Sequence, residues 1–336
     1  MSRPPDPQAN PSAANPSAAA APNAAERAPR PGVLRRVLAS DFVYRFCRDP
    51  VALGSGLVLL VLVTLAVLAP VLAPQNPYDP MQLSIMDSEL PPFWMDGSDP
   101  RFVLGTDAQG RGIFSTILYG TGISLLIGVF AVLLQGVLGI VIGLSAGYLG
   151  GRLDSFLMRL ADIQLSLSTL MVAIIALAVF QATFGANAYE DLALLMIIMV
   201  IGIAEWPKYA RTVRASVLAE KHKEYVDAAR VIGLGRVRIM LRHVLPNTLS
   251  PILVISTVQV AEAVMTEAAL SFLGLGMPVD QPSLGALIRS GFEFIFSGSW
   301  WITLFPALVL IALILAINLL GDWLRDVLNP KLYKKV

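Results

Sequence analysis

The 336-residue chain is poor in the residues that carry most enzyme and metal chemistry. It has one cysteine, Cys47, and two histidines, His222 and His243. A single cysteine excludes an intramolecular disulfide framework and provides no metal site. No GxxxxGKS or GxxxxGKT stretch occurs, so the chain has no recognisable ATP site of its own. Neither histidine lies in a long apolar run and nothing assembles a Ser-His-Asp set, so we expect no catalytic residues.

Charge is scarce as well. Charged residues make up 15% of the chain, whereas hydrophobic residues make up 55% and the mean hydropathy is +0.67. This composition is typical of a polytopic membrane protein. The formal net charge of +1 says little about partners, and we expect no nucleic acid among them. Residues 1–32 are rich in Pro, Ala and Asn, which predicts a disordered tail. They are not a signal peptide, because the first long apolar run begins only at Val51.

Six apolar runs can cross a hydrocarbon core of roughly 30 Å, which takes roughly 20 helical residues. They cover about residues 51–73, 121–143, 156–189, 189–208, 250–273 and 300–321, and they predict an all-α bundle. Asp162 lies in the third run, where we expect it to pair with Arg159 or Arg152. Close helix packing and a tight turn are predicted from four glycines: Gly143, Gly147, Gly150 and Gly151.

Lys and Arg are distributed unevenly over the segments that connect these runs. Six spans place both termini on one side, and 22 of the 25 Lys and Arg residues fall on that side. The positive-inside rule assigns this side to the cytoplasm, together with the loop of residues 208–248. Residues 33–49 alternate basic and apolar groups, which fits either an interfacial helix or a plain basic flank.

The polar, basic segment of residues 224–247, EYVDAARVIGLGRVRIMLRHVLPN, separates two of the apolar runs. Its first part predicts a helix on which Tyr225, Ala229 and Ile232 share one face. Ala228 and Ala229 keep part of that helix low in bulk. We therefore expect another surface to approach this segment closely.

Glycine interrupts that helix at Gly233 and Gly235, because glycine is a poor helix former that readily adopts turn conformations. A second short helix is predicted over about residues 236–242. Pro246 disfavours helical geometry at Leu245 and suits the first turn of the next helix. The segment is therefore predicted to be helix, glycine turn, helix and proline, at a membrane surface.

This pattern resembles the cytoplasmic EAA loop of permease subunits in ABC importers. The family pattern is Glu-Ala-Ala, three residues, Gly, nine residues, Ile, one residue and Leu-Pro. The residues at that spacing are Asp227, Ala228, Ala229, Gly233, Leu245 and Pro246. Two positions depart from the pattern, because Asp227 replaces Glu and His243 replaces Ile. The resemblance assigns ATPase coupling to this loop, with Glu224 and Arg242 nearby. An ordinary amphipathic connector between two membrane helices is the alternative.

Four further stretches resemble the C-type permease subunits of the dipeptide, oligopeptide and nickel importer group. They are GTDAQGRG at 105–112, AGYLGGRLDS at 146–155, EAALSFLGLG at 267–276 and NLLGDWLRDVLNP at 318–330. Gly112 replaces the final Asp of the group's GTDxxGRD. The resemblance divides the chain after the tail into an interfacial helix, first span and external loop (33–118), a type I transmembrane domain (119–322) and a cytoplasmic C-terminus (323–336).

The resemblance also implies an assembly in the bacterial inner (plasma) membrane. The chain would pair with a second permease subunit as a heterodimer and dock two ABC ATPase subunits, which would hold ATP and magnesium. An extracytoplasmic substrate-binding protein would deliver the solute, and this chain would bind no cofactor. Peptide is the expected solute, with nickel, glutathione-like and sugar-derived solutes as alternatives. A secondary transporter would need its own ion-coupling site and often has repeated halves, which the sequence does not display.

Polar side chains within the spans are candidates for a translocation pathway, because charges in hydrocarbon usually face a bundle interior or a water cavity. Gln259, Glu262 and Thr266 share one side of the fifth predicted span. Glu267 and Gln135 are further candidates. For each of them, a structural hydrogen bond between helices is the alternative.

Overall fold

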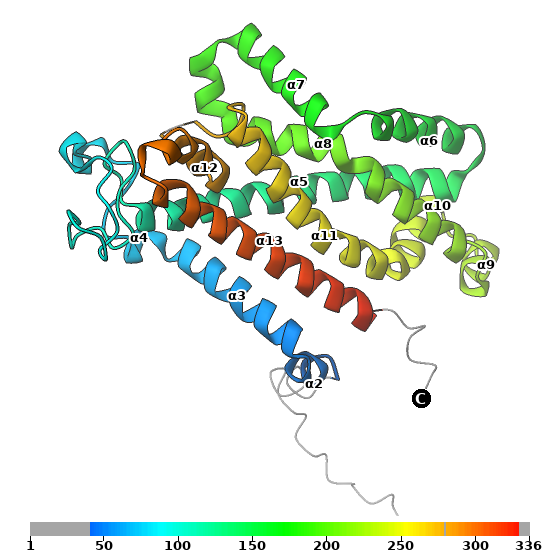
Figure 1. Cartoon of the computed structure of the whole chain (residues 1–336). Coiled ribbons are helices and arrows are strands. Elements are labelled where there is room, and N and C mark those ends of the chain that lie inside the picture. The colour runs from blue at the N-terminus through cyan, green and yellow to red at the C-terminus, as the bar shows by residue number, and fades with distance from the viewer. Residues whose placement is uncertain (1–40, 279, 329–336) are drawn as a thin grey trace, which may run out of the picture. The chain divides into compact units, whose positions relative to one another are not determined.

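The computed structural model of the protein describes residues 41–278 and 280–328, whose regular secondary structure is helical apart from one isolated β-bridge between Thr106 and Gly112 (Figure 1). The chain divides into two compact units at Arg45, and the account below concerns the second unit. The predicted tail and residues 33–40 lie outside the described residues. Helix α2 (Asp41–Arg48) confirms helical structure for the rest of the segment that precedes the first span. Its place at a membrane interface stays a prediction.

Five helical stretches in the described part of the chain are long and apolar enough to cross a membrane. They are α3 (Pro50–Val67), α5 (Ile113–Leu149), α8 (Ala186–Glu220), the stretch of α10 (Arg236–Ile239), η3 (Met240–Val244) and α11 (Leu245–Phe272), and α13 (Trp301–Leu328). The shorter elements are α4 (Ala69–Leu72), η1 (Pro80–Gln82), η2 (Ile85–Asp87), α9 (Glu224–Val231), α12 (Leu284–Phe292) and η4 (Ile295–Ser297). The predicted all-α bundle is confirmed.

The third predicted span is not one straight helix. It is divided between α6 (Gly151–Ser166) and α7 (Thr169–Phe184), which meet at an angle of 87°. Leu167 is extended between them, and the Ser166 hydroxyl donates to the Ile163 carbonyl at 2.7 Å. Serine side chains compete in this way with helical backbone bonds. Six spans result only if the bent pair, visible in Figure 1, is counted as one.

Ion pairs attach the polar helix α6 to α8. The predicted pairing of Asp162 with a neighbouring arginine of its own helix is wrong, because Asp162 pairs with Arg211 of α8. One α8 turn later, Arg214 donates from Nε and Nη2 to the two carboxylate oxygens of Asp154, at 2.5 and 2.7 Å. Bidentate pairs of this kind fix orientation as well as distance. Both acidic residues of α6 are thus paired with arginines of α8.

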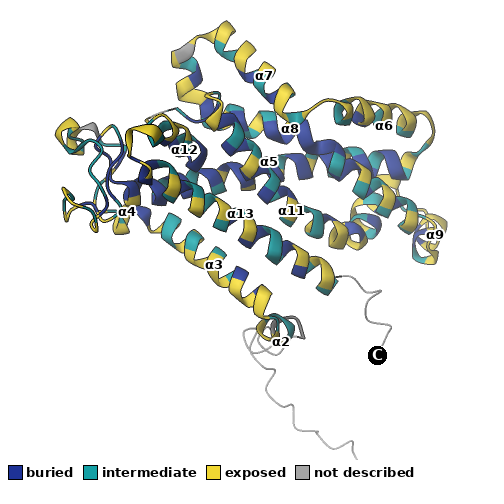
Figure 2. Ribbon diagram, viewed as in Figure 1, coloured by how far each residue is buried: buried dark blue, intermediate teal, exposed yellow. Residues whose placement is uncertain are grey.

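Close contact between α5 and α8 forms the centre of the molecule, and both helices are largely buried along it (Figure 2). Glycine stands at every fourth residue of the α5 face concerned: Gly139, Gly143 and Gly147. A Cβ atom on Gly139 would lie 2.2 Å from the Tyr209 Cβ, and one on Gly143 would lie 2.4 Å from the Ala210 carbonyl oxygen. Small residues permit this approach of two backbones. The predicted packing role of Gly143 and Gly147 is confirmed.

The turn after α5 is made by Gly150 and Gly151, as predicted. Their φ angles are +68° and +63°, a region that favours glycine because it has no Cβ. The Gly150 N–H donates to the Ala146 carbonyl at 3.0 Å. The Lys221 ammonium, at the end of α8, donates to the Gly147 carbonyl, also at 3.0 Å. The end of α5 is therefore joined to the segment that follows α8.

The loop before α5, which the sequence predicts to be external, is organised by a buried ion pair. Arg111 donates from Nε to Asp107 at 2.7 Å, and both side chains are almost fully buried. Gly112, which stands where the resembled group has Asp, begins α5 without a side-chain cap. Its N–H instead donates to the Gln75 side-chain oxygen at 2.8 Å, and a Cβ there would lie 3.1 Å from the Phe102 ring. The Gln75 side chain thus joins the start of α5 to the segment that follows α4.

Gly143→Ala is expected to destabilise the bundle, because its methyl group has no space against the α8 backbone. Overpacking of this kind typically costs about 1–3 kcal/mol. Gly136→Ala is the matched control, since its Cβ would meet only the Tyr209 ring at an ordinary 3.7 Å. The measurement is the thermal unfolding midpoint of the purified protein in detergent. Equal midpoints for the two variants would show that the α5–α8 approach tolerates a methyl group.

Candidate functional site

The segment between α8 and α11 has the predicted order of helix, glycine turn, helix and proline. Helix α9 ends before Gly233, whose φ is +83°, and α10 begins after Gly235. The second helix is shorter than predicted, because α10 spans four residues and continues as the π-helical segment η3 directly into α11. Pro246 lies in the first turn of α11, as predicted. The expectation that it disfavours helical geometry at Leu245 is wrong, because Leu245 is helical (φ −54°, ψ −47°) and η3 continues into α11 without a break.

The predicted face of α9 is only partly correct. Ala229 is buried together with Val226, in the same core cluster as Ile239 and Val244. Ile232 lies beyond the last α9 residue and is 76% exposed. Ala229 therefore needs to be small because its own chain packs against it, and the expectation that a partner approaches this residue is corrected.

Four apolar side chains of the loop are exposed, and we name this set the coupling ridge. It consists of Val231, Ile232, Val237 and Leu241, which are between 54% and 88% exposed. These side chains come from α9, its C-terminal end, α10 and η3. The ridge was not predicted from the sequence. Its residues are apolar residues of the loop that do not belong to the buried core cluster.

Most of the EAA-like residues lie at the surface around the ridge. Exposed positions are Glu224, Asp227, Ala228, Gly233, Arg242 and Pro246, whereas Leu245 is half-buried. Asp227 accepts from Arg230 at 2.8 Å within α9. The Arg230 guanidinium also donates to the Lys221 carbonyl at 3.2 Å. The carboxylate at the departing motif position thus helps to hold α9 against the end of α8.

Tyr225 holds the loop to both long helices. Its hydroxyl donates to the Glu220 carboxylate at 2.6 Å and accepts from the Asn247 amide at 3.2 Å. Burial, together with the bond to Glu220, raises the pKa of the Tyr225 hydroxyl to about 12. Tyr225 therefore stays protonated at neutral pH and keeps its bond to the carboxylate. The loop has a fixed orientation relative to α8 and α11.

Two of the pathway candidates bind each other inside the bundle. Gln259 of α11 donates to the Gln135 side-chain oxygen of α5 at 3.0 Å, and both residues are buried. Such a bond joins helices in an apolar medium. For Gln135 and Gln259 the structure therefore favours the alternative to a pathway role, a structural hydrogen bond between helices.

Glu267 is fully enclosed by hydroxyl groups. It accepts from Ser124 of α5 at 2.9 Å and from Ser271 of α11 at 2.6 Å. Ser124 also accepts from the Leu284 N–H at the start of α12, at 3.3 Å. The Glu267 carboxylate therefore connects three helices, and it lines no described cavity.

Unlike Gln135, Gln259 and Glu267, which are buried, Glu262 has a partly exposed side chain. It pairs with Lys208 of α8 at 2.5 Å, and Lys208 also lies 2.7 Å from Glu205. Glu205 is buried and accepts from the Thr169 hydroxyl at the start of α7, at 2.5 Å. Lys208 stands at the start of the loop predicted to be cytoplasmic, and this network was not predicted from the sequence. The spacing of Glu205 and Lys208, three residues apart on a helix, is the signal that could have shown it.

These features define a helical protein with five stretches long and apolar enough to cross a membrane and a loop that exposes four apolar side chains. A family model described as "Binding-protein-dependent transport system inner membrane component" matches residues 139–334, and the chain belongs to that family. A second model, "N-terminal TM domain of oligopeptide transport permease C", matches residues 38–92. The protein is therefore a transport permease, and the ABC permease resemblance is confirmed.

Relatives are similar along most of the chain. A dipeptide transport system permease protein of Haemophilus influenzae is 36% identical, covering 87% of this chain and 94% of its own. A di/tripeptide permease of Pseudomonas aeruginosa is 37% identical, covering 87% and 92%. A putative peptide permease of Brucella suis is 40% identical, covering 82% and 87%. An inward-facing structure of the MetNI methionine ABC transporter aligns with 64% of this chain and 96% of its own at 18% identity, with a TM-score of 0.48.

Gly233→Ala is expected to loosen the coupling loop, because alanine resists the left-handed backbone that Gly233 adopts. The conformational cost is roughly 1–2 kcal/mol, so amide exchange across α9 should accelerate by about tenfold. Gly235→Ala is the control: its φ is −62°, and neither glycine has an atom near the added methyl group. Hydrogen exchange of the purified protein measures both. Faster exchange in Gly235→Ala alone would contradict this account of the turn.

Proposed function

We propose that this chain is one of two permease subunits of an ATP-driven importer of dipeptides or oligopeptides. The relatives from Haemophilus influenzae, Pseudomonas aeruginosa and Brucella suis support peptide as the solute, because each is described as a peptide permease. The similarity covers at least 82% of this chain, so it includes most of its spans. The second permease, a different chain, completes the pathway.

The coupling ridge is the observation that carries the proposal. Four exposed apolar side chains on a loop between two membrane helices form a patch of the kind that marks protein–protein contact. We assign it to the groove of an ABC ATPase subunit, two of which hold the ATP and magnesium. Closure of the ATPase pair would move α9 and α10 together, and η3 would transmit the motion into α11. Access to the pathway would then alternate between the two sides of the membrane.

Orientation follows from the same assignment. The ridge has to lie in the cytoplasm, where ATP is, and both termini lie there too. The distribution of Lys and Arg supports this orientation independently. Solute would arrive at the external loops from an extracytoplasmic substrate-binding protein, in the inner membrane of the bacterium.

Ile232→Asp is expected to uncouple transport, because it places a charge in the centre of the apolar contact. In proteoliposomes that contain both permeases, both ATPases and the binding protein, ATP-driven uptake of dialanine should fall by about tenfold or more. Less ATPase should be retained on the purified permease pair. Ile232→Met, which keeps the side chain apolar and similar in volume, should retain both.

Normal uptake by Ile232→Asp would remove the ridge from the docking surface. Absence of ATP-driven uptake of dialanine and longer peptides by the unaltered assembly would overturn the peptide assignment. Together, the variant and the unaltered assembly test coupling and solute separately.

A topology reporter tests the orientation. Alkaline phosphatase, which is active only outside the cytoplasm, should be active when fused after residue 90 or residue 285 and inactive after residue 240. The reason is the concentration of Lys and Arg on one side of the spans. Strong activity at residue 240 would place the loop out of reach of any ATPase.

A further inference from the structure

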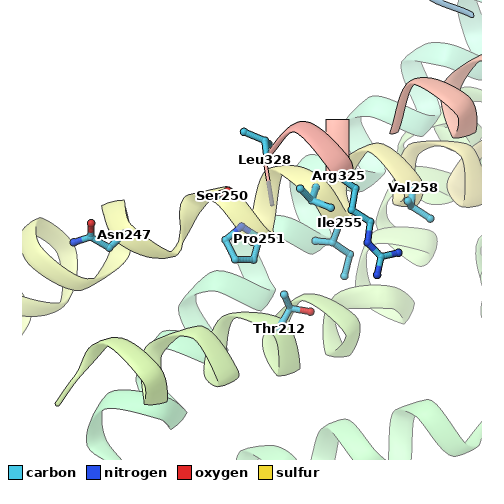
Figure 3. A pocket seen from close by; sticks show the side chains of 9 residues that line it. Thr212, Asn247, Ser250, Pro251, Ile255, Val258, Arg325 and Leu328 are labelled. Carbon is cyan, nitrogen blue, oxygen red and sulfur yellow. The ribbon is translucent and has the colours of Figure 1, made fainter. Parts of the chain in front are cut away.

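A groove opens between α8, α11 and α13, with a volume of about 570 Å³ (Figure 3). Its walls are mostly apolar and include Val254 and Val258 of α11. Thr212 of α8 and Arg325 near the end of α13 add polar groups. Asn247 and Ser250, in the first turns of α11, also line the groove, so this end of it lies next to the coupling loop.

The groove leads towards the ion pair of Lys208 and Glu262. On α11, Glu262 follows Val258 by four residues, and on α8, Lys208 precedes Thr212 by four residues. Residues four apart lie on the same face of a helix, one turn from each other. Both walls of the groove therefore continue, one turn deeper, into the two partners of the ion pair, which are 2.5 Å apart.

This ion pair lies inside the helical bundle, beside the middle part of α5. Gln259, one turn from Glu262, is bonded to Gln135, which is 22 residues from the start of α5 and 14 from its end. At about 1.5 Å per residue, those distances are roughly 33 and 21 Å. The side chains of Lys208 and Glu262 are 30% and 38% exposed. Exposed charges at this depth are costly in hydrocarbon, so this face borders an aqueous path or protein instead of lipid.

The charges of the network favour a cation. Two carboxylates, Glu205 and Glu262, share the single ammonium of Lys208, which leaves a net charge of −1. Glu205 is buried and also bonded to Thr169, whereas Glu262 is on the exposed side. A second ammonium group could therefore replace Lys208 at Glu262 while Lys208 keeps its bond to Glu205.

We propose that Glu262 is a transient binding site for the protonated amino group of a solute in the translocation pathway. The solute class is a peptide with a free N-terminus, which rests on the proposed function. The groove gives access from the cytoplasmic side, and Arg325 at its mouth attracts the solute carboxylate. Glu262 thus holds the solute inside the bundle until it leaves through the groove.

Thiol labelling tests the hydration and charge of the groove without transport. Cys47 is the single cysteine, so Cys47→Ser gives a cysteine-free chain to which Val258→Cys is added. The nucleotide-free full importer, in inside-out vesicles, is treated with the cationic trimethylammonioethyl or the anionic sulfonatoethyl methanethiosulfonate. Leu253→Cys is the control, because this exposed residue lies about 140° around α11 from Val258.

Val258→Cys should react with the water-soluble reagents, and Leu253→Cys should not. Glu262→Gln should lower the ratio of cationic to anionic rates by about fivefold. Glu224→Gln, on the exposed loop, should leave the ratio unchanged. No reaction at Val258→Cys would indicate a face covered by lipid or protein and would overturn the site, as would an unchanged ratio in Glu262→Gln.

Competition identifies the ligand. Dialanine should slow the labelling of Val258→Cys by about twofold at half-occupancy, and N-acetyl-dialanine, which lacks the ammonium group, should not. Glu262→Gln should abolish the protection. Equal protection by both peptides, or protection that persists in Glu262→Gln, would overturn the proposal. If the unaltered importer takes up dialanine but shows no protection, this site fails alone; if uptake also fails, the proposed function fails.

Discussion

The approach of α5 to α8 determines most of what surrounds it. Three glycines at four-residue spacing let one backbone lie directly against Tyr209 and Ala210 of the other. Without an added hydrophobic drive between helices in lipid, such close packing is a main source of association. Because α8 is held in this way, its last turns are in position to pair with α6, and its end is in position to carry α9.

Three sets of polar side chains inside the bundle bind each other. The Gln135–Gln259 bond, the hydroxyl groups around Glu267 and the Lys208 network each join helices that are distant in sequence. A polar group left unpaired in a membrane costs several kcal/mol. A difference of ~1 kcal/mol is already a large part of the stability of a folded protein. The pairs therefore restrict how the helices can rotate about each other. Only the Lys208 network combines pairing with exposure, which distinguishes it from the other two.

Local signals in the sequence predicted the positions of the spans and the order of the loop elements. Gly233 and Pro246 gave the turn and the helix start because their backbone preferences act within one or two residues. Hydropathy could not locate the bend before Thr169, since an apolar run is equally apolar when it is bent. The partner of Asp162 was missed because Arg211 is brought to it by helix packing.

The second feature that the sequence did not predict correctly is which residues of α9 share a face. The prediction that Tyr225, Ala229 and Ile232 share a face assumed that the helix continued to Ile232, but α9 ends one residue earlier. The residues of the coupling ridge lie before and after the glycine turn. Helical periodicity in the sequence therefore cannot group them. Which apolar residues of the loop are buried is decided by the packing against Val226 and Val244.

The π-helical segment at Met240–Val244 has a mechanical consequence. A π turn contains more residues than an α turn, so η3 accommodates extra chain without interrupting the helical path from α10 into α11. Removing one residue from it would leave an ordinary α-helix with little change in the angle between α10 and α11, because a π turn and an α turn that is shorter by one residue cover nearly the same rotation. The extra residue is therefore absorbed within this one segment, and the angular setting of the loop on its membrane helix does not depend on it.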